Sequence, residues 1–102
     1  MFDKLEKEIE EKFNKGVRRL GGRSFKWVSP GVRGVPDRVV IMPGGLIWFV
    51  ELKRDGGVVS PLQKNMIRLL NKLGANALVV EGEAEVAQFL RALEQEQEAR
   101  GL

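Results

Sequence analysis

One stretch of the chain, residues 34–63, limits what the protein can fold into. It contains two short apolar runs, Val39–Ile41 and Ile47–Val50, which are separated by Pro43-Gly44-Gly45. A turn rich in proline and glycine between two such runs predicts a β-hairpin. Continuous apolar runs are typical of strands that are covered on both faces. We therefore expect the hairpin to lie within a sheet that helices flank.

The length of the turn decides which residues of the hairpin face each other. A three-residue loop places Asp37 opposite Glu51, whereas a two-residue loop would pair Asp37 with Leu52. Three-residue loops commonly close with a glycine in the left-handed region, and this turn offers two glycines. We therefore predict the three-residue loop. Since residues two apart in a strand share a face, Lys53 should lie on the same face as Glu51.

Two opposed carboxylates need a partner for their negative charge. Like charges directly opposite each other destabilise a strand pair. A divalent cation would neutralise Asp37 and Glu51, and hard oxygen ligands suit Mg²⁺, which also binds phosphate oxygens. The alternative is a surface ion pair between Lys53 and one of the acids. The apolar character of both strands argues against this alternative.

The composition narrows the chemistry further. The 102 residues include no histidine and no cysteine. This excludes histidine-based general-base catalysis, Ser-His-Asp triads, disulfides and most zinc sites. The length suits one globular domain over residues 1–102. No apolar run has membrane-spanning length and no signal-peptide core is present, so we expect an intracellular, cytoplasmic protein of a virus or bacterial host, without a membrane partner.

The net charge of +3 is unevenly distributed along the chain. Residues 1–54 carry 12 Lys/Arg and 7 Asp/Glu, whereas residues 55–102 carry 5 and 7. A basic field beside an acidic pocket suits a polyanion that is cut at a metal ion. Solvated helix charge explains many of these residues equally well. The candidates for contact with such a polyanion are Lys15, Arg18, Arg19, Lys26, Arg33 and Arg38.

Hydrophobic periodicity predicts the remaining elements. Apolar residues at steps of three and four indicate helices over residues 2–20, 61–73 and from 86 onward, with strands over 24–28 and 77–80. The first helix should end at Gly21-Gly22, and Gly16 within it indicates a close approach by another backbone. Ser60, Pro61 and Gln63 form a helix start with a capping box, and the helix should bury Leu62, Met66, Leu69, Leu70 and Leu73.

Three segments together resemble a known nuclease family. Gly34–Asp37, Phe49–Lys53 and Ser60–Gln63 are similar to the motifs of VRR-NUC (virus-type replication-repair nuclease) domains, within the PD-(D/E)XK nuclease superfamily. The resemblance extends from the first helix to the strand at Leu78. It implies an α/β, restriction-endonuclease-like core of order α-β-β-β-α-β plus a C-terminal helix, with a mixed sheet flanked by helices. It also implies phosphodiester cleavage that depends on Mg²⁺ or Mn²⁺, with DNA junctions or flaps as substrates.

The resemblance also implies roles for single residues. Asp37, Glu51 and the carbonyl of Leu52 would be metal ligands, and Lys53 would be the catalytic lysine. The family's first helix supplies a further acid to the metal site.

That acid and an active-site glutamine can also be located by position. The resemblance implies an acid about eleven residues before the terminal glycine of the helix, which is Glu10 counted from Gly21, and we prefer it to Glu6 and Glu11. Gln63 matches the family's active-site glutamine, and its role as the capping-box partner of Ser60 is an equal alternative.

Two classes of function are compatible with these residues. The first is a metal-dependent endonuclease, and the second is a branched-DNA-binding module without catalysis. The complete set of Asp37, Glu51 and Lys53 favours the enzyme. Within that class we prefer a homodimer that resolves Holliday junctions to a monomer that cuts flaps or nicks, since a two-fold dimer presents two equal sites to a junction. Phe2, Leu5, Phe13 and Gly16 of the first helix would supply the dimer surface.

Overall fold

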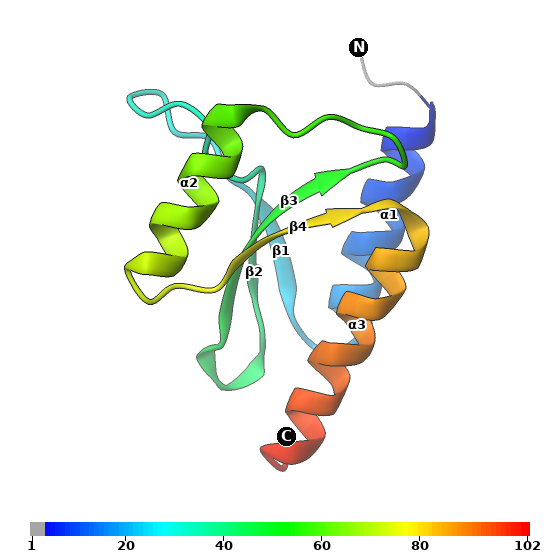
Figure 1. Ribbon diagram of the computed structural model, residues 1–102. Coiled ribbons are helices and arrows are strands. Elements are labelled where there is room, and N and C mark those ends of the chain that lie inside the picture. The colour runs from blue at the N-terminus through cyan, green and yellow to red at the C-terminus, as the bar shows by residue number, and fades with distance from the viewer. Residues whose placement is uncertain (1–3) are drawn as a thin grey trace.

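The computed structural model describes residues 4–102. Within them the chain forms, in order, α1 (Lys4–Arg19), β1 (Arg23–Lys26), β2 (Arg38–Ile41), β3 (Ile47–Lys53), α2 (Pro61–Lys72), β4 (Ala77–Glu81) and α3 (Gly82–Ala99). This order confirms the predicted α-β-β-β-α-β core with a C-terminal helix (Figure 1). None of the helices in this range is both long and apolar enough to cross a membrane.

The sheet is mixed, as predicted. Its strand order is β1-β2-β3-β4, with antiparallel pairing up to β3 and parallel pairing between β3 and β4. Helices α1 and α3 pack side by side on one face of the sheet, and α2 lies on the other face (Figure 1). The sheet therefore has one face that two helices cover and one that a single helix covers.

The core lies between the sheet and the pair α1 and α3. Phe13 and Val17 of α1 are fully buried against Val40 and Val50 of the sheet. Phe13 also stacks on Phe89 of α3, with ring centroids 5.7 Å apart. The even-numbered residues of β2 and β3 face this core, as the alternation of a strand requires.

Helix α2 buries less than its sequence predicts. No residue of α2 is fully buried, and Leu62, Leu69 and Leu73 are exposed, Leu73 by 73%. The prediction of a buried face was wrong for these three leucines because α2 contacts the sheet mainly at β4 and leaves β1 and β2 uncovered on that side.

The hairpin has the predicted three-residue turn. Met42 N–H donates to Leu46 O at 2.8 Å, and the register pairs Ile41 with Ile47 and Arg38 with Val50. Gly44 and Gly45 both have positive φ, 86° and 84°. Both glycines therefore occupy the left-handed region that closes such a loop.

Helix α1 ends as predicted, but its glycine has a different neighbour. Gly22 N–H donates to Val17 O at 3.0 Å, which caps the helix. A Cβ atom on Gly16 would lie 2.2 Å from Leu90 Cδ1, so a side chain of α3, and not another backbone, approaches it. Because α3 covers Phe13 and Gly16, the dimer surface predicted on this helix was wrong for both residues. Phe2 lies outside the described residues.

We predict that Gly34→Ala destabilises the protein by at least about 2 kcal/mol. Gly34 has a φ of +83°, and an added Cβ would lie 2.8 Å from the main-chain oxygen of Leu62. The backbone of α2 would have to move to relieve this contact. Urea unfolding should show the loss, and Gly31→Ala in the same loop, where an added Cβ meets nothing within 4 Å, should change stability little. Equal midpoints for the two variants would contradict the prediction.

Candidate active site

The end of the hairpin ladder fixes the position of Asp37. The last paired residues are Arg38 and Val50, and the same register places Asp37 opposite Glu51. The main-chain oxygen of Asp37 accepts from Trp27 N–H at 2.8 Å, and its side-chain Oδ1 accepts from Leu52 N–H at 2.8 Å. Asp37 is thus held from the strands on both sides, and the predicted opposition of Asp37 and Glu51 follows from the three-residue turn.

The carbonyl of Leu52 lies at an interrupted position of the ladder. Continuing the register places Leu52 opposite Pro36, which has no N–H to donate. The Leu52 N–H is taken by the Asp37 side chain instead of the Pro36 carbonyl. Because of Pro36, the Leu52 carbonyl oxygen does not receive the N–H hydrogen bond that another residue would donate at this position. This suits the predicted role of the oxygen as a metal ligand.

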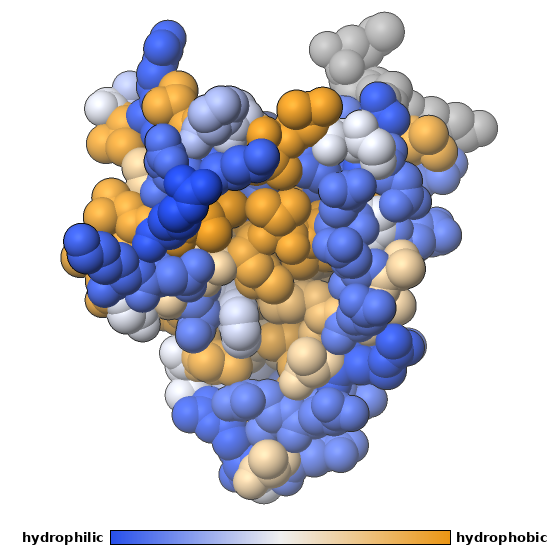
Figure 2. All heavy atoms as spheres, in the orientation of Figure 1, coloured by the Kyte–Doolittle hydropathy of each residue, from blue (hydrophilic) through white to orange (hydrophobic). Residues whose placement is uncertain are grey.

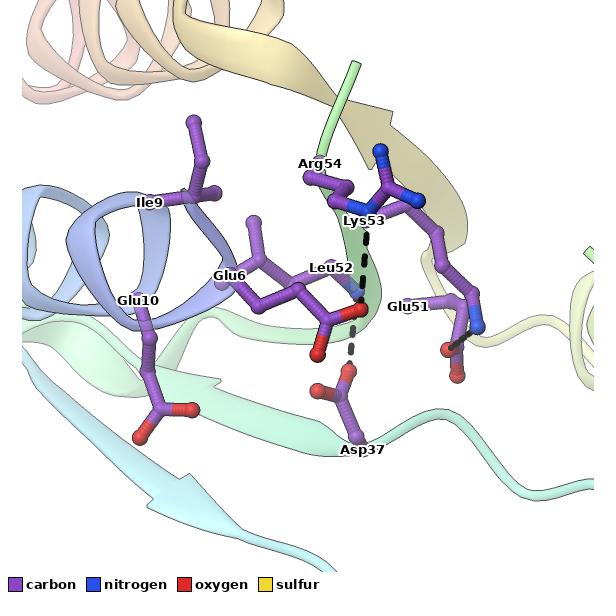
Figure 3. A pocket seen from close by; sticks show the side chains of 8 residues that line it. All are labelled: Glu6, Ile9, Glu10, Asp37, Glu51, Leu52, Lys53 and Arg54. Carbon is purple, nitrogen blue, oxygen red and sulfur yellow. Dashed lines mark hydrogen bonds and ion pairs between the residues drawn. The ribbon is translucent and has the colours of Figure 1, made fainter. Parts of the chain in front are cut away.

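The candidate residues line one small hollow of about 150 Å³. Figure 3 shows that α1 supplies one wall and the ends of β2 and β3 the other. The hollow is lined by Glu6, Ile9, Glu10, Asp37, Glu51, Leu52, Lys53 and Arg54. The structure therefore brings together five predicted site residues from three elements. Within residues 4–102, however, no three carboxylates are close enough to form a ready metal cage.

Glu51 is a buried acid with an unused oxygen. It is 3% exposed, and its Oε2 lies 3.4 Å from Lys53 Nζ. Its Oε1 is buried and has no hydrogen-bond partner among the described residues. Burial raises the pKa of the Glu51 carboxyl, the Asp37 charge raises it further, and Lys53 opposes both. A cation near Oε1 would offset the cost of this buried charge.

Asp37 is in a similar environment. Burial raises the pKa of the Asp37 carboxyl, whereas the Leu52 hydrogen bond and Arg38 act in the opposite direction. The charge of Glu10 adds a smaller increase. Burial thus raises the pKa values of both opposed carboxyl groups. Raised pKa values of this kind are typical of carboxylates in functional sites that bind a cation.

Two glutamates of α1 reach the hollow. Glu10 Oε1 lies 3.6 Å from Arg38 Nη1, and Glu6 Oε1 lies 3.7 Å from Arg54 Nε. The charge of Glu10 acts on the pKa of Asp37, and Glu6 and Glu10 both line the hollow, so the preference for Glu10 stays a prediction. Glu11 is exposed and does not line the hollow.

Arg38 is buried and is not a surface contact for DNA. It is 7% exposed, its Nε donates to Ser24 Oγ at 2.9 Å, and its guanidinium faces Glu10. The prediction that Arg38 binds DNA was therefore wrong. The alternation of β2 could have revealed this, because Arg38 shares a face with the buried Val40.

The side chain of Gln63 serves the helix start. Its Oε1 accepts from Ser60 N–H at 3.0 Å and its main-chain N–H donates to Ser60 Oγ, which confirms the capping box. Gln63 lies beside Arg33 in a separate hollow and does not line the acidic one. Its role in the active site stays a prediction that these contacts do not support.

Arg54, which the sequence analysis did not consider for the site, lines the acidic hollow directly after Lys53.

The remaining basic candidates are exposed but dispersed. Lys15, Arg18 and Arg19 lie in the last turns of α1, about 14 to 20 Å along the helix from Glu6 at its first turn. Lys26 and Arg33 are exposed near the loop that precedes Asp37.

Comparisons with known proteins agree with the geometry of the fold. Residues 3–84 match the VRR-NUC domain family. "Putative nuclease p44" of Acyrthosiphon pisum secondary endosymbiont phage 1 is 42% identical over 78 residues, which are 76% of this chain and 84% of that protein.

Two solved structures share the architecture. A structure titled "VRR_NUC domain" superposes with a TM-score of 0.81 at 32% identity, over 87% of this chain and 97% of that one. A second, titled "VRR_NUC domain protein", gives a TM-score of 0.65 at 20% identity over 93% and 89%, and supports the fold alone. The family match, the relative and the first structure together show that the chain belongs to the VRR-NUC family.

Proposed function

We propose that the protein is a metal-dependent DNA endonuclease. The observation that carries the proposal is the buried Glu51 opposite the half-buried Asp37, with Lys53 beside them and one Glu51 oxygen without a partner among the described residues. A module that only binds DNA gains nothing from this arrangement, which costs stability. The name of the phage relative, a nuclease, supports the same class.

The residues of the hollow fit a hard divalent cation. Asp37, Glu51, the carbonyl of Leu52 and Glu10 would hold Mg²⁺ or Mn²⁺, since all four offer oxygen ligands. When bound, such an ion polarises the phosphate and acidifies a water. The unpartnered Glu51 oxygen and the raised pKa values of both opposed acids support this fit.

The protein's own side chains orient the reaction. Leu52 N–H and Trp27 N–H fix Asp37, and Arg38 fixes Glu10 from within the sheet. Lys53 is partly exposed, so its ammonium can touch Glu51 and a phosphate or water in the hollow at once. It would hold the attacking water or donate to the phosphate oxygen as negative charge develops there.

We propose branched DNA as the substrate and a homodimer as the active form, with a monomer that cuts flaps or nicks as the alternative. Exposed apolar side chains on the sheet face beside α2 support an association surface there, in place of the surface first predicted on α1. Phe25, Ile41 and Ile47 share this face and are 40–48% exposed, and Leu69 of α2 and Leu73 directly after it are exposed too. A two-fold dimer would present two equal sites to a four-way junction.

We predict that Asp37→Asn and Glu51→Gln each reduce cleavage by more than about 100-fold, which corresponds to ~2.7 kcal/mol in the barrier. Both changes keep the size of the side chain and remove the anionic ligand. The assay uses labelled four-way junctions, flaps and duplexes with Mg²⁺ or Mn²⁺. Glu11→Gln, an exposed change outside the hollow, is the control. Wild-type rates in either site variant would contradict the assignment.

The same assay tests the choice between the two acids of α1. We expect Glu10→Gln to cleave more slowly than Glu6→Gln.

The raised pKa of Asp37 predicts a pH-dependent gain in stability for Asp37→Asn in EDTA. The folded state binds the Asp37 proton more tightly than the unfolded state, so Asp37 costs stability as the pH rises from its ordinary pKa, about 3.9, through the raised value. Asparagine avoids this cost and still accepts from Leu52 N–H. The variant should melt a few degrees higher than wild type at pH 7, and the difference should shrink toward pH 4. A lower melting temperature at pH 7 would refute it.

The dimer proposal predicts paired incisions. Sedimentation with and without a junction should show two chains per complex, and mapped cuts should lie symmetrically on two strands. Leu69→Lys on the proposed surface should shift the protein toward monomer, whereas Glu94→Lys on α3 should not. A monomer that makes a single unpaired cut would instead establish the flap or nick alternative.

A further inference from the structure

Strand β4 is an edge of the sheet, and the direction of its main-chain groups is known. Phe49 N–H donates to Asn76 O at 2.8 Å, which sets the phase of the parallel ladder between β3 and β4. In a parallel pair, alternate residues of a strand direct both main-chain groups to the same neighbour. Leu78 and Val80 therefore face β3, whereas Ala77, Val79 and Glu81 face away from the sheet.

Side chains of the protein close this edge at both ends. The Asn71 amide donates to Ala77 O at 2.9 Å and accepts from Ala77 N–H at 3.0 Å, as a neighbouring strand would. Glu81 N–H donates to Glu85 Oε1 at 2.9 Å. Between them, Val79 is the position of the described edge whose N–H and C=O point outward with no partner from residues 4–102. An unpaired position of this kind can bond another strand.

An apolar hollow of about 410 Å³ runs along the same edge, between β4 and α3. Trp48, Phe89 and Leu93 line its apolar part, and the rings of Trp48 and Phe89 meet edge to face at 5.6 Å. Figure 2 shows this apolar surface in the recess between α2 and α3, with hydrophilic residues on both sides. A groove formed by a strand edge and a helix is a common binding site for extended peptides.

The negative charges along the apolar hollow indicate which kind of partner can bind there. Glu85 and Glu96 of α3 line it, and no lysine or arginine does. If a second copy of this chain bound here through the same surface, its glutamates would face these glutamates and repel them, which disfavours a second copy. The glutamates would also repel the phosphates of a DNA backbone. A cationic protein segment is the complementary partner.

The spacing of the acids defines the segment further. Glu85 and Glu96 are eleven residues apart in α3, or about 16 Å. Residues four apart in an extended strand are separated by about 13 Å, and lysine side chains are long and flexible. One face of the segment should therefore carry lysine or arginine, an apolar residue and a second lysine or arginine at alternate positions.

We propose that the β4 edge binds an extended, cationic peptide segment of another protein by strand addition. The segment pairs with the main chain of Val79, places its apolar side chain on Trp48, Phe89 and Leu93, and places its two cations beside Glu85 and Glu96. This site is separate from the acidic hollow and does not depend on the nuclease activity.

A synthetic peptide tests the proposal directly. The probe is acetyl-Thr-Lys-Thr-Leu-Thr-Lys-Thr-amide, whose lysines and leucine share one face when it is extended. Titration into ¹⁵N-labelled protein should shift the Val79 amide and the Trp48 indole signals. The Trp27 indole, which packs on Phe49 away from this hollow, is the internal control. A peptide with glutamates in place of the lysines, and one that is N-methylated on its pairing edge, should each bind at least about tenfold more weakly.

Matched variants of α3 complete the experiment. Glu96→Lys should weaken binding of the probe, whereas Glu94→Lys, with the same change of charge two positions away and outside the hollow, should not. Both should keep wild-type cleavage. Equal binding of the glutamate peptide, or no shift of Val79, overturns the proposal. Shifts of the same signals that depend on protein concentration alone, or that a DNA duplex produces, overturn it in favour of a second copy or of DNA.

Discussion

The hydrogen bond that closes the hairpin, from Met42 N–H to Leu46 O, determines the geometry of the whole site. It fixes a three-residue turn, and the turn sets the register by which Asp37 meets Glu51 at the other end of two strands. Because side chains alternate along a strand, a slip of one residue would send one acid into the core and the other to the opposite face. The two positive-φ glycines of the turn thus control a carboxylate pair six and seven residues away.

This register places two carboxylates, Asp37 and Glu51, where their negative charges repel each other. Glu51 is buried and Asp37 half-buried opposite it, and their neighbours offset only part of the cost of burying these charges. Arg38 has the central compensating role, since it is enclosed by the sheet and α1 and contacts Ser24 and Glu10. A buried cation is itself expensive, so Arg38 and the acids are stable only as a group. The conflict is concentrated where a bound cation would resolve it.

The sequence was sufficient for features that local rules determine. The turn length, the capping box at Ser60 and the order of elements all depend on residues close in the chain. Features that depend on which helix covers which face could not be predicted in this way. The contact of Leu90 with Gly16 and the exposure of Leu69 and Leu73 result from the long-range packing of α3 and α2 on the sheet. The raised pKa values of Asp37 and Glu51 likewise reflect burial that no spacing of residues reveals.

The amide of Asn71 has a consequence for the behaviour of the protein at high concentration. Open sheet edges are templates for aggregation, and natural proteins interrupt them. Here one side chain bonds both main-chain groups of Ala77, and with Glu85 at the other end it shortens the exposed edge of β4 to a single position. A chain without that amide would offer a longer, apolar β4 edge to any other unfolded chain. Protection of this edge against pairing between copies therefore depends on a residue that does not line the acidic hollow.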